Sequence, residues 1–376
     1  MNEFLHYLAE LRKKNLYRYR LDREDQWINF SDNDYLGLRK NKLISEAIKQ
    51  SIDQYGNGSG ASHLISGHFV SHSRVEEKIA GILGFEKSLF FHSGYIANAA
   101  FFKNFLKKGD DVFLDKLCHA SIYDGVLSVD ANLIRYPHLN YQYLEKKLKT
   151  SKASKKIIVT DSVFSMDGDC ALLKDLIALS SQYNAYLFID DAHGFGVYGK
   201  HGLGLMEEQN CLNFNKSRII HLTTFGKAAG ISGAALCGPE HIIEFIKQKS
   251  REYIYTTATP PYIADGVLTA IDLIIHGNHL RDQLKQNIVY FRGLIRNQDY
   301  LSNVHGPIQP IMINNNLKVI SYQEALKAIG IHVAAVRAPT VPLNSSRLRV
   351  TIRADHTQED IRLLASQLNY TLENEH

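Results

Sequence analysis

The chain has 376 residues, of which 45% are hydrophobic and 22% are charged, and its formal net charge is +4. This length exceeds what one simple core fills, so we expect two or three subdomains. The charge is mild and no basic run with interleaved aromatic residues occurs, which argues against a nucleic-acid-binding protein. The four cysteines are scattered, with no CxxC pair, which argues against a disulfide framework.

The first residues predict an amphipathic helix rather than a signal peptide or a transmembrane span. Apolar side chains recur at Phe4, Leu8 and Leu11, with Glu3 and Glu10 among them. No later apolar run is long enough to cross a bilayer. We therefore expect a cytoplasmic protein with no membrane partner.

The central part of the chain alternates short β-rich runs with helical stretches. The predicted strands are Ser88–Phe91, Asp111–Leu114, Lys156–Thr160, Ala185–Ile189, Ile219–Thr223 and Ala234–Cys237. The predicted helices between them include Ala97–Lys107, Leu172–Tyr183 and Glu240–Arg251. This alternation predicts an α/β fold whose mostly parallel sheet has helices on both faces. Ligands of such sheets bind beyond the carboxyl ends of the strands.

The two ends of the chain predict a smaller α+β lobe. The N-terminal part holds a helix and the compact turn Asn33–Leu38, and long amphipathic helices and short strands follow from about Gly277, including Leu348–Ile352. We predict an N-terminal segment, 1–50, that joins the small lobe. A large domain, 51–276, and a C-terminal domain, 277–376, complete the chain.

Five polar clusters directly follow predicted strands. In chain order they are His92–Asn98, Asp115–Ser121, Asp161–Asp169, Asp190–Gly194 and Thr224–Gly233. Because the carboxyl ends of parallel strands meet at one rim of a sheet, we expect these clusters to converge on one site.

Lys227 lies in the last of these clusters, among glycines and alanines that leave space for a bulky group on its amine. A lysine that carries a covalently bound cofactor needs that space, and desolvation that lowers its pKa. For this segment alone, a solvated loop lysine is the alternative.

Asp190 and His193 follow a buried strand. Pyridoxal phosphate withdraws electrons only while its ring nitrogen stays protonated, and a buried carboxylate such as Asp190 keeps that proton in place. His193 is suited to bonding the phenolic oxygen of the same ring. Two alternatives remain open here: a helix N-cap at Asp191, and a metal site of a hydrolase built from Asp190, Asp191 and His193.

The other three clusters offer groups of the kinds that such a cofactor needs. A strand turns through Gly94 and Tyr95 into a helix, whose first N–H groups are suited to phosphate. His119 is suited to stacking on an aromatic ring, and Ser165 to donating a hydrogen bond. The alternatives are a plain strand–helix turn, a satisfied loop histidine, and a polar turn with Gly168 at a positive φ.

From about Leu11 to about Leu368 the chain resembles the α-oxoamine synthases, pyridoxal-phosphate enzymes of fold type I. The shared motifs are NDYLGL (Asn33–Leu38), GSGASHLISG (Gly58–Gly67), HSGYIAN (His92–Asn98), CHAS (Cys118–Ser121), SVFSMDGD (Ser162–Asp169), IDDAHGFGVYG (Ile189–Gly199), TFGKAAGISGAA (Thr224–Ala235), IYTTATPP (Ile254–Pro261), PTVP (Pro339–Pro342) and RLRVTI (Arg347–Ile352). So many motifs in the same order make chance improbable.

The resemblance implies a role for each matching residue. Lys227 would hold the cofactor and act as a base, Asp190 would hold the ring proton, and His193 would contact the phenolic oxygen. His119 would stack on one face of the ring and Ala192 on the other. The residues expected to contact the phosphate or another cofactor atom are Gly94, Tyr95, Ser165 and Thr224. In a homodimer, Thr256 and Thr257 would reach the phosphate bound by the neighbouring subunit.

Within the family, the segments Ile254–Pro261, Ile308–Pro310 and Ala334–Pro342 favour the branch that condenses L-alanine with a pimeloyl thioester. The thioester carrier would be coenzyme A or acyl carrier protein. Arg349 would take the alanine carboxylate, which suits its forked guanidinium. Asn33 and Thr340 would lie near the substrate, and Arg18 would bind the far carboxylate of the acyl chain. The alternatives are another branch, such as glycine C-acetyltransferase, and a non-catalytic partner subunit.

The chain departs from the family pattern at a few positions. Ala61 replaces a common glycine, His63 replaces a common arginine, and Cys118 replaces a polar residue. With His68 and His72, His63 completes a group of three histidines. No acidic or thiol partner lies close to them in the sequence, so we predict no metal site.

Overall fold

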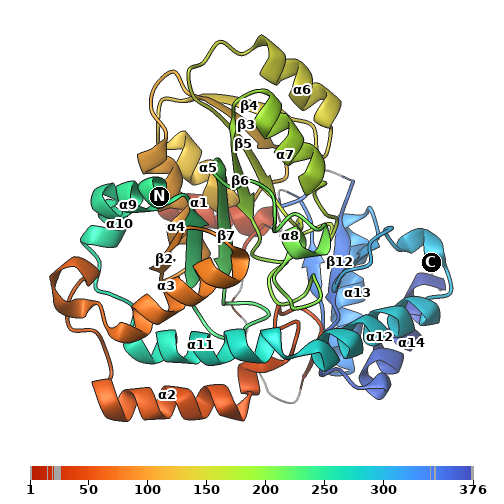
Figure 1. Ribbon diagram of the computed structural model, residues 1–376. Coiled ribbons are helices and arrows are strands. Elements are labelled where there is room, and N and C mark those ends of the chain that lie inside the picture. The colour runs from red at the N-terminus through yellow and green to blue at the C-terminus, as the bar shows by residue number, and fades with distance from the viewer. Residues whose placement is uncertain are drawn as a thin grey trace.

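The computed structural model describes residues 2–14, 16–18, 20, 27–338, 340–342 and 344–373. Its largest element is a seven-stranded sheet (Figure 1), in the order β2 (Lys87–Phe91), β8 (Ala234–Gly238), β7 (Ile219–Thr224), β6 (Tyr186–Asp190), β5 (Lys156–Asp161), β3 (Asp111–Asp115) and β4 (Asn132–Tyr136). Only β8 runs antiparallel to its neighbours in this sheet. The predicted mostly parallel sheet is therefore confirmed.

Side chains of the central strands pack into two separate apolar cores, one on each face of the sheet. On β6, Leu187 and Ile189 belong to one core and Phe188 belongs to the other, as the two-residue period of a strand requires. One face is covered by α4 (Gly94–Phe105), α5 (Ala120–Leu127) and α9 (Glu240–Lys249). The other is covered by α3 (Val70–Leu83), α6 (Tyr141–Thr150), α7 (Leu173–Gln182) and α11 (Pro261–Ile275).

Three elements differ from the sequence prediction. Strand β4 was not predicted, because its polar residues Asn132 and Arg135 are exposed at the sheet edge and interrupt the apolar pattern. Helix α4 begins at Gly94, since Ser93 caps it there. The stretch predicted as one helix from Glu240 divides at Ser250 into α9 and the short α10 (Arg251–Ile254).

The smaller lobe contains a three-stranded antiparallel sheet in the order β11 (Ala334–Val336), β12 (Arg347–Thr351), β9 (Ile308–Met312). Its helices are α12 (Asn278–Leu294), α13 (Asn316–Ala328) and α14 (Gln358–Glu373). The short strand β1 (Ile28–Asn29) pairs with β10 (Ile331–His332), which joins this part of the N-terminal segment to the lobe. Helix α2 (Lys42–Tyr55) instead packs on α11 of the large domain. The domain boundaries stay a prediction.

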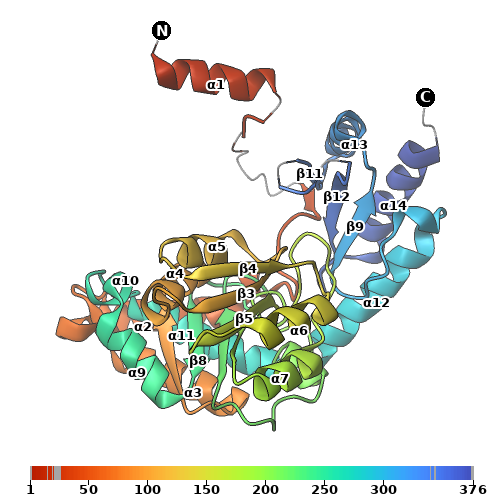
Figure 2. The same ribbon diagram turned by 90° about the horizontal axis from the view of Figure 1, so that it is seen from above.

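The remaining elements are short or stand apart from the two sheets. Helix α1 (Glu3–Lys13) has no buried residue and projects from the rest of the molecule (Figure 2). The short turns of helix are η1 (Leu38–Lys40), η2 (His63–Gly67), α8 (Leu205–Glu208) and η3 (Gln298–Tyr300). Among the described residues, no helix combines the length and apolar character that crossing a membrane requires.

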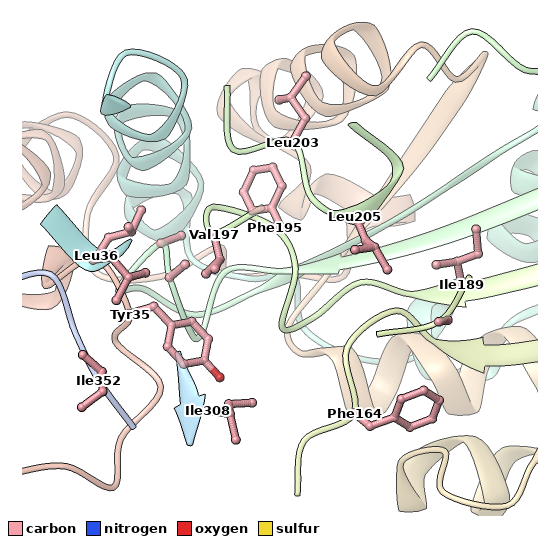
Figure 3. Close-up of a cluster of buried hydrophobic side chains, with 14 of the residues drawn as sticks. Tyr35, Leu36, Phe164, Ile189, Phe195, Val197, Leu203, Leu205, Ile308 and Ile352 are labelled. Atoms are coloured by element: carbon pink, nitrogen blue, oxygen red, sulfur yellow. The ribbon is translucent and has the colours of Figure 1, made fainter. Parts of the chain in front are cut away.

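One apolar cluster joins the two lobes and the N-terminal segment. Figure 3 shows Tyr35 of the N-terminal segment beside Ile308 and Ile352 of the small lobe and Val197 of the large domain. Gly168 lies at the same junction with a φ of +74°, and a Cβ there would lie 2.6 Å from the Ile308 carbonyl oxygen. The predicted positive φ at this glycine is confirmed. This packing holds the small lobe against the rim of the large sheet.

Candidate active site

A cavity of about 310 Å³ opens at the carboxyl ends of β2, β3, β5, β6 and β7. Each of the five predicted clusters contributes at least one residue to the lining of this cavity. One residue from each cluster, in chain order, is Gly94, His119, Asp161, Asp190 and Lys227. The predicted convergence is therefore confirmed, and the parallel strand directions explain it, since these five strands all end at the same rim.

Asp190 is the last residue of β6, and its side chain is buried. One carboxylate oxygen accepts a hydrogen bond from the Asn98 amide at 2.8 Å, and the other accepts from the Ala192 backbone N–H at 3.1 Å. Asn98 is held in turn by the Ser121 hydroxyl, to which it donates at 2.9 Å. These bonds fix the orientation of a carboxylate that faces the cavity.

Asn98 was not singled out from the sequence as a site residue. It lies four residues after Gly94 in α4, and residues four apart share a helix face. The first turn of this helix was predicted to face the cofactor, so this spacing could have identified Asn98 as a residue of the site.

Lys227 follows β7 and points into the same cavity, so that its side chain is half-buried. Desolvation lowers the pKa of its amine from 10.5 to about 8, although the Asp190 and Asp161 carboxylates oppose this shift. Burial also raises the pKa of Asp161 well above its usual range, and the nearby charge of Asp190 adds to that effect. The lysine is therefore much closer to its neutral, nucleophilic form at physiological pH than a solvated lysine.

His193 is buried, and its pKa lies well below its ordinary value, first because of desolvation and then because of the charges of Lys227 and Arg349. Its Nδ1 lies 2.6 Å from the hydroxyl of Tyr35, which the sequence analysis did not name as a site residue. Burial raises the pKa of Tyr35 to about 12, so this phenol keeps its proton. Its hydroxyl donates to Oδ1 of Asn33 at 3.2 Å, and its contact with Nδ1 holds the imidazole of His193 in place.

His119 lies at the start of α5, where it caps the helix and faces the cavity. Its Nδ1 lies 2.8 Å from the Ser121 hydroxyl, and its backbone N–H donates to Asp161 at 3.3 Å. Desolvation lowers the pKa of this imidazole. A neutral ring fixed at this edge of the cavity is suited to stacking on a flat aromatic ligand.

The N-terminus of α4 forms an anion-binding corner. The first N–H groups of a helix have no partner within the helix, and Gly94 provides one of them beside the cavity. A Cβ at Gly94 would lie 2.6 Å from Cγ2 of Thr224, so only glycine lets the two segments approach this closely. The hydroxyl oxygen of Thr224 is buried and has no hydrogen-bond partner within the described chain. These donors fit a phosphate group.

Arg349 lies on β12 of the small lobe, and three hydrogen bonds hold its buried guanidinium at the edge of the site. It donates to the Ser165 carbonyl oxygen at 2.6 Å, to the Asn33 side chain at 3.0 Å and to the Thr351 hydroxyl at 3.2 Å. Asn33 lines the cavity, whereas Ser165 does not line it and contributes its backbone carbonyl to Arg349.

Tyr95 lines the cavity, and its hydroxyl donates to Asp124. Arg349, like Ser165, is not part of the lining, and it reaches the site through its hydrogen bond to Asn33. The other predicted residues outside the lining are Arg18, Thr256, Thr257 and Thr340, and all but the half-buried Thr256 are exposed. Their roles stay predictions. The segment predicted to mark the family branch includes Pro339, which lies outside the described residues.

Asp191 supports neither of the alternatives considered for its cluster. It is fully buried, accepts from the Ser162 hydroxyl and lies 3.3 Å from Nε2 of His221. One of its carboxylate oxygens also accepts a hydrogen bond from the N–H of Leu205 at 3.3 Å. Leu205 is the first residue of α8, so Asp191 bonds to the start of that helix and does not cap a helix next to itself in the sequence. Within the described part of the chain, Asp190, Asp191 and His193 form no group with metal-ligand geometry.

The sequence matches the model of the aminotransferase class I and II family over residues 25–368. The chain belongs to this family. Among its relatives is an 8-amino-7-oxononanoate synthase of Azoarcus sp. (strain BH72), 43% identical over 347 residues, which are 92% of this chain and 88% of the relative. A second, from Hydrogenovibrio crunogenus, is 44% identical over 91% of this chain and 86% of its own length.

Solved structures agree with this assignment. An 8-amino-7-oxononanoate synthase from Francisella tularensis superposes with a TM-score of 0.80 at 31% identity, covering 93% of this chain and 99% of that one. A serine palmitoyltransferase of Sphingomonas wittichii has a TM-score of 0.90 at 25% identity, covering 99% and 97%. The predicted resemblance and the fold of type I pyridoxal-phosphate enzymes are thereby confirmed.

The lowered pKa of Lys227 predicts how the cofactor-free protein captures pyridoxal phosphate. Only the neutral amine attacks an aldehyde, so the rate of covalent capture should rise with pH and reach half of its maximum near pH 8. Stopped-flow absorbance measures this rate, and Lys227→Ala should show no covalent capture. A rate that still rises tenfold per pH unit above about pH 9, as a solvated lysine would give, would contradict the assignment.

Proposed function

We propose that this protein is an 8-amino-7-oxononanoate synthase, which condenses L-alanine with a pimeloyl thioester and releases CO₂ and the thiol carrier. The observation that carries this proposal is the identity of over 40% with relatives of that name across nine-tenths of the chain. The carrier is coenzyme A or acyl carrier protein. The reaction belongs to the biosynthesis of biotin.

The cavity offers each of the groups that pyridoxal phosphate needs. Lys227 would hold the cofactor, Asp190 would keep the ring nitrogen protonated, and His193 would contact the phenolic oxygen. His119 and Ala192, which both line the cavity, would pack against the two faces of the ring. Gly94, Tyr95 and Thr224 at the start of α4 would bind the phosphate. When bound, the cofactor supplies a protonated ring that withdraws electrons from the α-carbon of the amino acid.

The protein's own residues then control where protons are held and moved. The carboxylate of Asp190 keeps a proton on the nitrogen that it faces. Neutral His193 would contact the phenolic oxygen of the cofactor, and the contact between its Nδ1 and the Tyr35 hydroxyl holds the imidazole in place. The amine of Lys227, with a pKa of about 8, removes the α-proton of alanine and returns a proton after CO₂ leaves.

Arg349 positions the amino acid by its carboxylate. The bonds from Arg349 to Ser165 and Asn33 fix the plane of the guanidinium, so a carboxylate meets donors that are already oriented. Asn33 and Thr340 lie near the substrate in this proposal. Arg18 binds the far carboxylate of the acyl chain.

The site is completed by a second copy of the chain. Thr256 and Thr257 lie outside the cavity of their own chain, and Thr257 and Tyr255 are exposed. Hydroxyl groups presented in this way are available to the phosphate of a neighbouring subunit. Two-fold pairing is also the commonest form of oligomer. We therefore include a homodimer in the proposal.

A substrate panel tests the reaction. The purified enzyme with pyridoxal phosphate is assayed for thiol release with alanine, glycine and serine, each with acetyl, succinyl, pimeloyl and palmitoyl thioesters. Alanine with pimeloyl thioester should be the best pair, by at least about tenfold in kcat/KM, because the acyl chains differ by several methylenes and a terminal carboxylate. A preference for glycine with acetyl thioester would assign the chain to glycine C-acetyltransferases. No turnover of any pair would favour a non-catalytic subunit.

Mixing two inactive variants tests the shared site. One is Lys227→Ala, and the other carries both Thr256→Ala and Thr257→Ala. A hybrid dimer rebuilds one intact site, with Lys227 from one chain and both threonines from the other, so about a quarter of wild-type activity should return after full random exchange. Subunit exchange is verified independently with differently tagged chains. Exchange without recovered activity would show that each site lies within one chain.

A further inference from the structure

Three histidines outside the cavity converge at the junction of η2 and α3. They are His63, His68 and His72, and one nitrogen of each lies within 4.8 Å of the others. Among the residues that the structure describes, no other group of three or more potential metal ligands is this close. The proposed reaction uses none of the three side chains.

The contact between His63 and His68 marks the centre of this group. Their Nδ1 atoms lie 2.9 Å apart, so one of them carries a proton that the other accepts, and a single proton lies between the two rings. In a tetrahedral zinc site with Zn–N bonds of about 2.0–2.1 Å, ligand nitrogens are about 3.3 Å apart. A cation can therefore replace the shared proton with a displacement of a few tenths of an ångström.

The third ligand is already oriented by an outer hydrogen bond. Nε2 of His72 lies 2.6 Å from the Thr259 carbonyl oxygen and donates to it, which leaves the lone pair on Nδ1. This is the arrangement that metal-binding histidines ordinarily have. The Nδ1 atom now accepts from the Phe69 N–H at 2.9 Å, and a metal ion would take the place of that donor. His68 is exposed, and its Nε2 lies 2.9 Å from the Ser73 hydroxyl, so this ring too has an outer partner on the nitrogen that faces away from His63.

The ring of His63 is also held in place. It stacks on Tyr253 of α10 with ring centroids 4.7 Å apart and an angle of 5° between the planes. A ligand that is fixed before binding loses little conformational entropy when the metal arrives.

We propose that His63, His68 and His72 bind a divalent cation of the borderline class, with Zn²⁺ as the best fit. Three imidazoles with no carboxylate exclude a preference for Mg²⁺ or Ca²⁺, which take oxygen ligands. A water molecule fills the fourth position of the tetrahedron. The absence of an acidic or thiol partner in the sequence argued against a metal, but three histidines and one water make a complete zinc coordination sphere.

The site would join η2, α3 and the loop that follows α10. His72 connects the metal to Thr259, whose hydroxyl also lies 3.1 Å from His92 at the cavity edge. A bound ion would thus stabilise the segment that carries Thr256 and Thr257. This inference is independent of the proposed reaction.

The test uses the holoenzyme with its cofactor, freed of metal by a chelator. Isothermal titration with Zn²⁺ should show one ion bound per chain, and Co²⁺ should give the visible absorption bands of a tetrahedral site. Replacing an exposed ligand, in His68→Gln, should weaken Zn²⁺ binding by at least about a hundredfold, since loss of even an outer partner costs ten- to a hundredfold. Mg²⁺ should not compete.

The chain has 17 histidines, so adventitious binding needs a matched control. His241→Gln removes an exposed histidine at the start of α9, outside the group, and should leave the affinity unchanged. His63→Gln provides a second ligand variant, with far-UV circular dichroism as the check of folding. No bound Zn²⁺, or equal affinity in wild type, His68→Gln and His63→Gln, would show that the three rings form only a hydrogen-bonded network.

Discussion

The buried carboxylate of Asp190 is the interaction on which the rest of the site depends. Burying an ionised group costs several kcal/mol unless hydrogen bonds and opposite charges compensate it. Asn98 and the Ala192 N–H supply the hydrogen bonds, and Lys227 supplies a positive charge across the cavity. The same low-polarity surroundings lower the pKa of the lysine and keep His193 neutral. One environment therefore sets the protonation of each group that the reaction needs.

The fold supplies this environment through strand order and through the junction of the lobes. The ends of β5, β6 and β7 lie side by side in the sheet, which places Asp161, Asp190 and Lys227 next to one another. The large domain alone would leave this rim open. Arg349 and Asn33 arrive from the small lobe and the N-terminal segment, and the apolar cluster around Tyr35 holds them there.

Much of this arrangement follows from local sequence patterns. The central strands are apolar and end in polar residues, so their positions, the parallel sheet and the convergence of five clusters were all predicted. The edge strand β4 was not, because a half-exposed strand with Asn132 and Arg135 lacks an apolar run. Asn98 and Tyr35 were missed as site residues because they act through Asp190 and His193 rather than through their own chemistry.

Contacts made by the backbone, and any contact made between chains, are harder to predict. Ser165 was expected to use its hydroxyl, but the structure shows its carbonyl oxygen bonded to Arg349, a group that every residue has. The three histidines, which are spaced five and then four residues apart, meet in space through η2, a geometry that helical spacing alone does not predict. The places of Thr256 and Thr257 in a shared site depend on a second chain and stay predictions.

The central claim is that Asp190 controls the ring proton, and one variant tests it most directly. Asp190→Asn keeps the size of the side chain and a hydrogen bond but removes the charge. Exchange of the α-proton of L-alanine with solvent deuterium, measured by NMR with the cofactor bound, should slow by about a hundredfold or more. Cofactor binding, measured by absorbance, should remain largely intact. Exchange at the wild-type rate in the cofactor-loaded variant would contradict the account.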